Sequence, residues 1–298
     1  MARTSLVALL SLTPFLATCG SLLDLCPPVD GRVGFFSRGD CVFTRGSFFA
    51  GHEWVTYFGN DAIDPADRFS ESEIGYVVEG NRRTDFPLEM LVHLNTSVLA
   101  YTNAVVEYQD RPENQAIHFL LRADSQTPAA KEEAEALMLA KSKEAVRLWS
   151  TERIRALTLI GQVCHTIQDS YSPAHVVRRR TANGSRCIDV MKSFVTRAPG
   201  FEMDHKGRPA QFHGGDETTN IGHTTTEDSI YREGRDCHTP RTAQEVRDCL
   251  SEDAQAAVDG TTDYLAAMHD LVVNGVSEDA VDAALGDYFA RRFAFCPD

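Results

Sequence analysis

In the stretch RIRALTLIGQVCHTIQDSYSPAH, residues 153–175, an apolar helical pattern is followed directly by histidine and aspartate side chains, which are residue types that can bind metals. Its apolar residues recur at the 3.6-residue spacing of one helix face, which predicts a helix from Thr151 to Ser170. This apolar stripe comprises Ile160, Val163, Cys164 and Ile167. A helix with such a stripe is expected to lie in the core of a helical protein.

Three candidate metal ligands accompany the stripe. His165 and Asp169 lie four residues apart and share one helix face, while Pro173 should end the helix and leave His175 just beyond it. Gly161 removes a side chain one turn before His165, which we expect to leave room for a ligand. A histidine beside an apolar stripe is often a hydrogen-bonded core residue instead. A carboxylate near a helix C-terminus is disfavoured by the helix dipole, so a compensating cation such as a metal ion is expected at Asp169.

The remaining chain also has mainly helical periodicity. It predicts further helices over Glu53–Ile63, Pro87–Tyr108, Pro128–Trp149, Thr242–Val273 with a break at Gly260, and Ser277–Phe293. Residues 176–222 are rich in Gly, Thr, Asn and charge and are expected to form a long loop region. The predicted fold is all-α, with one multi-helix domain over residues 21–298 and long loop insertions.

Residues 1–20 have the layout of a secretory signal peptide, because Arg3 precedes an apolar stretch from Leu6 to Ala17 and small residues follow. We therefore predict a secreted protein, and no later segment has the apolar length of a transmembrane helix. Export favours disulfides. Their candidate partners are Cys26, Cys41, Cys187, Cys237, Cys249 and Cys296. Cys164 is expected to be a free, buried thiol, and the lack of any C-x-x-C pair predicts that a metal would be held by His and carboxylate.

The formal net charge of −14 argues against a broad basic surface for a nucleic-acid backbone. No stable nucleic-acid partner is therefore expected. The charge does not exclude catalysis on phosphodiesters, because bound zinc ions would concentrate positive charge in one cleft.

Two later segments have the spacing of a ligand pair. GHTTTED places His223 and Glu227 four residues apart, so both can face one ion if the segment is helical. HGGDE gives His213 and Glu217 the same spacing, but its two glycines disfavour a helix. We therefore prefer the first pair and keep the second as its alternative.

Earlier segments supply further candidates. His52 in GHEW and His118 in AIHF are flanked by apolar residues and are either core histidines or ligands. Asp85 in GNRRTDFP is either a ligand or a helix N-cap, and Asp110 is its rival as a ligand.

Together these segments resemble the zinc-dependent phospholipase C and S1/P1 nuclease superfamily. HTIQDSYSPAH is similar to the H-x3-D-x5-H signature of that family, and GHEW resembles its early His-x-Trp element. GNRRTDFP, AIHF and GHTTTED resemble its Asp, His-Phe and His-x3-Glu elements. The matches occur in the order of the family and span residues 52–228, most of the mature chain.

The resemblance implies an all-α fold that encloses up to three zinc ions. The ligands of the first would be Asp85, His118, His165 and Asp169. Those of the second would be His52 and Asp169, so that Asp169 would bridge two ions. Those of the third would be His175, His223 and Glu227.

The second zinc site departs from the family pattern. The family commonly completes this site with the backbone of a mature N-terminal tryptophan, whereas the tryptophans here are Trp54 and Trp149. Signal cleavage near residue 20 would leave roughly thirty residues before His52. We therefore expect this zinc to be the weakest bound, unless another residue such as Asp40 takes the missing place.

The resemblance implies a secreted zinc phosphodiesterase in which metal-activated water attacks phosphorus and Asp85 orients that water or accepts its proton. The acidic surface favours phospholipid over nucleic acid. The pairs Phe35-Phe36 and Phe48-Phe49 either pack in the core or make transient contact with a membrane surface. The alternatives are an S1/P1-type nuclease or 3′-nucleotidase with the same ligands, and a non-catalytic binding module stabilised by zinc.

Overall fold

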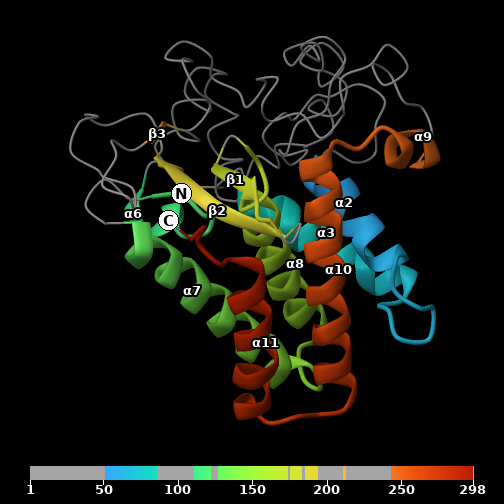
Figure 1. The fold of residues 1–298 in the computed structure, drawn as a ribbon. Helices are drawn as coiled ribbons and strands as arrows, with labels where there is room; N and C mark the ends of the chain where they lie inside the picture. The colour runs from blue at the N-terminus through green and yellow to red at the C-terminus, as the bar shows by residue number, and fades with distance from the viewer. Residues whose placement is uncertain are drawn as a thin grey trace, which may run out of the picture.

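A computed structural model describes residues 51–85, 111–121, 127–173, 175–182, 185–193, 211–212 and 243–297. This part of the chain is mainly helical, as predicted, with a small sheet at one end of the helices (Figure 1). The helices are α2 (Gly51–Asp61), α3 (Glu71–Asp85), α6 (Pro112–Gln115), α7 (Thr127–Leu148), α8 (Arg153–Asp169), α9 (Ala243–Asp248), α10 (Glu252–Val273) and α11 (Glu278–Arg292). The strands are β1 (Val176–Arg180), β2 (Arg186–Ser193) and β3 (Gln211–Phe212).

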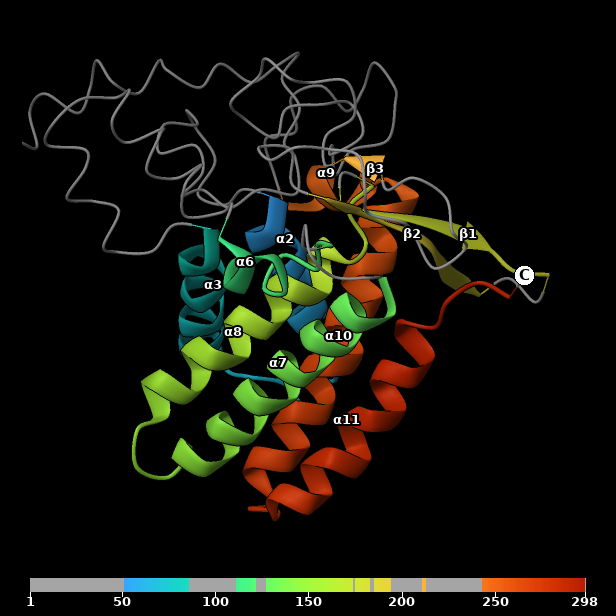
Figure 2. The ribbon, with the colours of Figure 1, turned by 90° about the vertical axis from the view of Figure 1, so that its left-hand side faces the viewer.

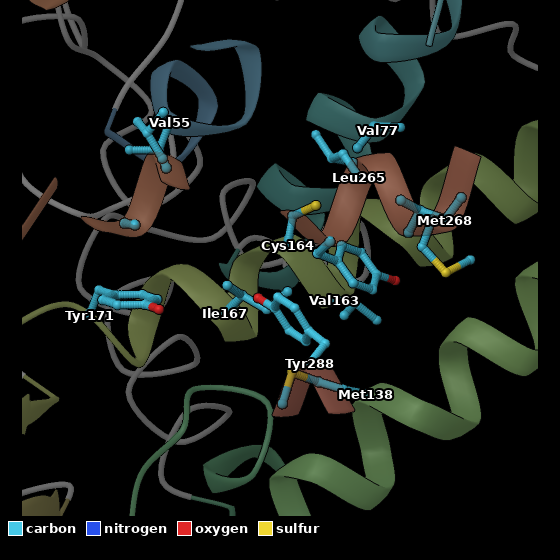
Figure 3. Close-up of a cluster of buried hydrophobic side chains, with 14 of the residues drawn as sticks. Val55, Val77, Met138, Val163, Cys164, Ile167, Tyr171, Leu265, Met268 and Tyr288 are labelled. Carbon is cyan, nitrogen blue, oxygen red and sulfur yellow. The ribbon is translucent and has the colours of Figure 1, made fainter. Parts of the chain in front are cut away.

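Helix α8 lies among the other helices and packs against α3, α7 and α10 (Figures 1 and 2). The predicted apolar stripe is confirmed, since all four of its residues are 0% exposed. Val163, Cys164 and Ile167 lie in one connected core with apolar side chains of the neighbouring helices (Figure 3). Cys164 is a free thiol, as predicted, and burial raises its pKa well above the usual range, so it stays protonated.

Two glycines allow the close contact between α3 and α8. A Cβ on Gly161 would lie 1.9 Å from the carbonyl oxygen of Val77, and one on Gly80 would lie 2.2 Å from that of Thr158. No real side chain tolerates such distances, so only glycine permits the two backbones to approach this closely. The expectation that Gly161 leaves room for a ligand is therefore wrong, because the backbone of α3 fills the space.

The predicted helices are largely confirmed, with one correction. α7 and α11 begin and end within one residue of their predicted bounds. The break predicted at Gly260 is wrong, because α10 runs unbroken through it. The break lies before α10, where the Ser251 side chain caps the helix by accepting from the N–H of Ala254. Gly260 instead makes space for Tyr171, since a Cβ there would lie 2.9 Å from the ring.

The small sheet lies in the region predicted to be a loop, so that prediction is wrong for residues 176–180, 186–193 and 211–212. β1 pairs antiparallel with β2, and β2 pairs parallel with β3. The Cys187–Cys296 disulfide and a bridge between Ile188 and Phe295 fasten β2 to the segment after α11. These distant pairings stabilise strands that are too short and too highly charged to show a clear alternating pattern.

Arg178 on β1 connects the ends of two helices. Its guanidinium group donates to the carbonyl oxygens of Ser170 and Arg292, at 2.8 Å each. It also lies over the ring of Tyr171, 4.1 Å from the ring centroid. The last carbonyls of a helix carry partial negative charge, so one cation compensates the C-terminal ends of both α8 and α11.

Several predictions fall outside the described residues. They concern the signal peptide, the helix over Pro87–Tyr108, the phenylalanine pairs at 35–36 and 48–49, and the cysteines at positions 26, 41 and 237. Cys249 is disulfide-bonded, in agreement with its place among the candidates. No helix in the described part of the chain has both the length and the apolar content that a membrane span requires.

Candidate metal centre

Four histidines converge on the carboxylate of Asp169. His52 comes from the first turn of α2, whereas His165 and Asp169 come from the last two turns of α8. His118 and His175 lie in the turns after α6 and α8. All five residues are buried, with exposed fractions of 4% or less. The fold therefore brings five of the candidate ligands, two of them from α8, to one place.

The loops that carry His118 and His175 are held by local structure. Directly after His118 the chain turns at Phe119, whose φ of 52° is rare for a bulky residue. The Phe119 side chain is fully buried in the core, and this burial offsets the strain of the turn. Lys192 in β2 joins the two loops, because its N–H donates to the carbonyl of His175 at 2.8 Å and its carbonyl accepts from Leu121 at 2.9 Å.

Each oxygen of the Asp169 carboxylate lies near two histidines. Oδ2 lies 3.0 Å from His118 Nδ1 and 3.1 Å from His165 Nε2. Oδ1 lies 3.1 Å from His52 Nε2 and 3.7 Å from His175 Nε2. His118 Nδ1 and His165 Nε2 are 3.2 Å apart, so they form a nearly equilateral triangle with Oδ2.

This triangle has the dimensions of three zinc ligands. Zn–N and Zn–O bonds are about 2.0–2.1 Å long, so two ligand atoms of a tetrahedral zinc lie about 3.3 Å apart. The edges of the triangle, at 3.0, 3.1 and 3.2 Å, come close to that separation. The buried group of His52, His165 and Asp169 could also hold a metal ion, since its ligand atoms all lie within 4.8 Å of one another.

Hydrogen bonds determine which ring nitrogen faces Asp169 in three of the histidines. In each of them Nδ1 lies close to an oxygen that only accepts, so Nδ1 carries the hydrogen and donates it. The pairs are His52 with Gln168 Oε1 at 2.8 Å, His165 with Asn81 Oδ1 at 3.1 Å, and His175 with the carbonyl oxygen of His118 at 2.7 Å. In the neutral ring, Nε2 then presents a lone pair to a carboxylate oxygen. A metal ion between the ring and the carboxylate could accept this lone pair, and metal-binding histidines are oriented by an Nδ1 hydrogen bond in this way.

A buried amide network lies behind the histidines. Asn81 Nδ2 donates to Gln168 Oε1 at 3.0 Å and to Thr56 Oγ1 at 2.8 Å. Gln168 Nε2 donates to Thr56 Oγ1 at 2.8 Å and to Thr261 Oγ1 at 3.3 Å. The sequence interpretation missed this network because its members come from four helices. The only signal was the position of Gln168 next to Asp169 in a buried helix.

The charge of Asp169 is maintained despite its burial. Burial by itself raises the pKa of this carboxyl, but the positive charges of His175, His165 and His52 and a hydrogen bond from His118 outweigh it and hold the pKa well below its usual range. The carboxylate is therefore anionic at neutral pH, which is the state that binds metal.

The other predicted ligands are not placed relative to this cluster. Asp85 is the last residue of α3, and its side chain lies outside the described part of the structure. The same holds for every atom of Asp110, His213, Glu217, His223 and Glu227.

No family model matches the chain, and no curated protein or solved structure matches it either. The donor set, its geometry and the order of the motifs are therefore the features that indicate a function. Imidazole nitrogens with a carboxylate form a donor set that suits zinc.

Replacing Gln168 with alanine is expected to weaken zinc binding by about 10–100-fold, because Nδ1 of His52 loses its acceptor and the ring loses its orientation. Competition with a chromophoric chelator measures this change. Gln162→Ala is the matched control, since Gln162 lies on the same helix but bonds to Lys141. If Gln168→Ala binds zinc as tightly as the wild type, the amide network does not orient the ligands.

Proposed function

We propose that the protein is a secreted, zinc-dependent phosphodiesterase of the phospholipase C type. The observation that carries this proposal is the buried Asp169 carboxylate with imidazole nitrogens on both of its oxygens, at 3.0 to 3.7 Å. Three protein ligands per zinc leave one tetrahedral position for water or substrate, as in catalytic zinc sites. The motifs from His52 to Glu227 also occur in the same order as in the resembled family of phosphodiesterases, and this order supports the proposed reaction.

In this proposal His118, His165 and Asp169 hold one zinc ion. Asp85, at the end of α3, either joins them as a further ligand in a five-coordinate site that still binds water or stays outside the ligand set. Bound zinc would supply positive charge for the phosphate oxygens and activate water for attack. Asp85, if it is not a ligand, orients that water or accepts its proton. Burial of His118, His165 and Asp169 strengthens the electrostatic interactions, because the local dielectric constant is low.

The net charge of −14 favours a phospholipid over a nucleic acid as substrate, because a polyanionic strand is repelled by an acidic surface. Parallel assays on phosphatidylcholine, single-stranded DNA and a 3′-nucleotide test this choice. We expect zinc-dependent hydrolysis of phosphatidylcholine with little turnover of the other two. Turnover of DNA or the 3′-nucleotide alone would identify a nuclease. Full zinc content with no turnover of any substrate would favour a zinc-stabilised binding module.

The proposed secretion is supported by the signal-like N-terminal pattern and by the Cys187–Cys296 disulfide, since disulfides persist mainly in oxidising compartments. Expression in the homologous host, followed by N-terminal sequencing of protein from the medium, tests it. We expect a mature N-terminus near residue 21. Retention of the uncleaved chain inside the cell would contradict secretion.

Zinc is expected to leave the protein as the pH falls well below about 6.5, the reference pKa of histidine. The lowered pKa of Asp169 keeps the carboxylate ionised in this range. Zinc is therefore expected to stay bound above this pH range and to be lost below it. Tighter zinc binding would shift the loss of zinc to lower pH. Zinc content and activity should fall together in a pH series. Full zinc content after dialysis with a chelator at about pH 3 would contradict a histidine-rich site.

A further inference from the structure

A single buried hydroxyl group lies between the two amides behind the metal centre. Thr56, on α2, is 0% exposed, and its Oγ1 donates to the carbonyl oxygen of His52 at 2.9 Å. The same oxygen accepts from Asn81 Nδ2 and from Gln168 Nε2, at 2.8 Å each. We propose that Thr56 is a positioning residue that holds His52 and His165 in the tautomer that binds a metal ion. This inference rests on the zinc binding in the proposed function.

The backbone of α2 determines the direction of these hydrogen bonds. A carbonyl oxygen can only accept, so the one hydrogen of the Thr56 hydroxyl is directed to His52. The hydroxyl lone pairs then remain for the two amides, which must both present an NH2 group. The amide oxygens therefore face the rings, with Gln168 Oε1 at 2.8 Å from His52 Nδ1 and Asn81 Oδ1 at 3.1 Å from His165 Nδ1. Each ring carries its hydrogen on Nδ1 and directs an Nε2 lone pair toward the carboxylate.

The two amides can reverse only together. Asn81 Nδ2 donates to Gln168 Oε1 at 3.0 Å, so turning one amide alone would bring two oxygens or two NH2 groups into contact. Turning both restores this bond in the opposite direction, and the ring hydrogens would then move from Nδ1 to Nε2. Thr56 prevents the reversal, because its one hydrogen would have to serve three surrounding oxygens, two of which would stay unpaired in the core.

The reversed arrangement would compete with metal binding. His52 Nε2 and His165 Nε2 each lie 3.1 Å from an oxygen of the Asp169 carboxylate. With the hydrogens on Nε2, both rings would donate charge-assisted hydrogen bonds to this buried anion. An ion would then have to displace both bonds, and both rings would have to change tautomer. Thr56 removes this competition at the three residues that could hold a metal ion together.

The second hydroxyl of the network does not have this effect. Thr261 Oγ1 accepts from Gln168 Nε2 at 3.3 Å. A hydroxyl can also donate, so Thr261 would serve an amide oxygen at the same position equally well. Thr56 differs because its hydrogen is engaged by a carbonyl. Removal of the Thr56 hydroxyl alone should therefore permit the reversal.

Zinc affinity of two substitutions at Thr56 in the full chain provides the first test. Valine has the shape of threonine without the hydroxyl, whereas serine keeps the hydroxyl. We expect Thr56→Val to weaken zinc binding by about 10–100-fold, as for other partners that orient ligands, and Thr56→Ser to bind zinc nearly as tightly as wild type. Thr158→Val is the matched control, because the Thr158 hydroxyl also donates to the carbonyl four residues earlier in its helix, at 2.9 Å. It should leave zinc affinity unchanged.

The second test needs no metal. Nuclear magnetic resonance of zinc-free protein with isotopically labelled histidine reports which ring nitrogens carry hydrogen, at a pH well above the reference histidine pKa of about 6.5. In wild type, Thr56→Ser and Thr158→Val, Nδ1 of His52 and of His165 should carry hydrogen. In Thr56→Val both Nδ1 atoms should lose it.

Nδ1 hydrogens that persist in Thr56→Val would overturn the proposal even if that variant binds zinc weakly, because the hydroxyl would then have only a structural role. Equal zinc affinities of the valine and serine variants would overturn it as well. If Thr56→Val does not fold, a neutron crystal structure of wild type decides, since the Thr56 hydrogen must point to the carbonyl of His52 and both rings must carry hydrogen on Nδ1. The expected tautomers and zinc affinities without phosphodiester hydrolysis would reject the proposed function alone, whereas a wild type that binds no zinc would reject both.

Discussion

Asp169→Asn is expected to remove bound zinc and phosphodiesterase activity together. The carboxylate lies within 3.7 Å of all four histidines of the cluster. An amide has the same shape but lacks the negative charge that offsets a buried cation. We expect zinc affinity to fall by more than about 100-fold, beyond the usual effect of removing an outer hydrogen-bond partner. Zinc content after gel filtration and turnover of phosphatidylcholine measure both effects.

His165→Ala should give the same result, because His165 shares Oδ2 and the same helix face. Asp259→Asn is the control: Asp259 lies exposed on α10 and bonds to Gln255, so zinc content and activity should not change. A folded Asp169→Asn protein with full zinc content and normal turnover would exclude Asp169 as a ligand.

Gly161→Ala is expected to destabilise the protein by about 3 kcal/mol, because an added methyl group meets backbone and not a movable side chain. Its Cβ would lie 1.9 Å from the carbonyl oxygen of Val77 and 2.7 Å from the backbone nitrogen of Asn81. The two helices must separate to accept it. Since Asn81 orients His165, zinc affinity should fall as well. Chemical denaturation of zinc-free protein measures the free energy of unfolding separately from metal binding.

The matched control for this substitution is Gly75→Ala on α3, where an added Cβ meets nothing within 4 Å. This change should stabilise the protein by about 0.5–1 kcal/mol, because alanine favours a helix over glycine. Opposite signs for the two substitutions would confirm the close helix contact. A Gly161→Ala protein as stable as wild type would show that α3 and α8 lie further apart.

The position of α8 is predictable from the sequence because its apolar stripe has a single clear period. The same pattern brings His165 and Asp169 to one face, so that ligand pair follows from the helix alone. α3 does not follow in this way. Its sequence, ESEIGYVVEGNRRTD, contains two glycines and few apolar residues, so its helical form depends on packing against α8.

Contacts between distant segments are not encoded in a local pattern. The sequence shows that Gly161 has no side chain, but not that the α3 backbone occupies the space. Gln168 contacts His52 across 116 residues, and no periodicity links them. The position of His175 beside Oδ1 also depends on its hydrogen bond to β2, a strand that the sequence interpretation did not predict.

The attachment of β2 has a consequence for how the protein matures. β2 holds the loop of His175, and it is itself fastened by a disulfide whose two cysteines are 109 residues apart. A chain that is synthesised and exported from its N-terminal side presents His52, His118, His165 and Asp169 well before Cys296 arrives. These four residues are therefore synthesised early, whereas β2, which holds the loop of His175, is fastened only after the disulfide forms. If the protein is exported and binds zinc as proposed, its full zinc content should therefore depend on oxidation of Cys187 and Cys296.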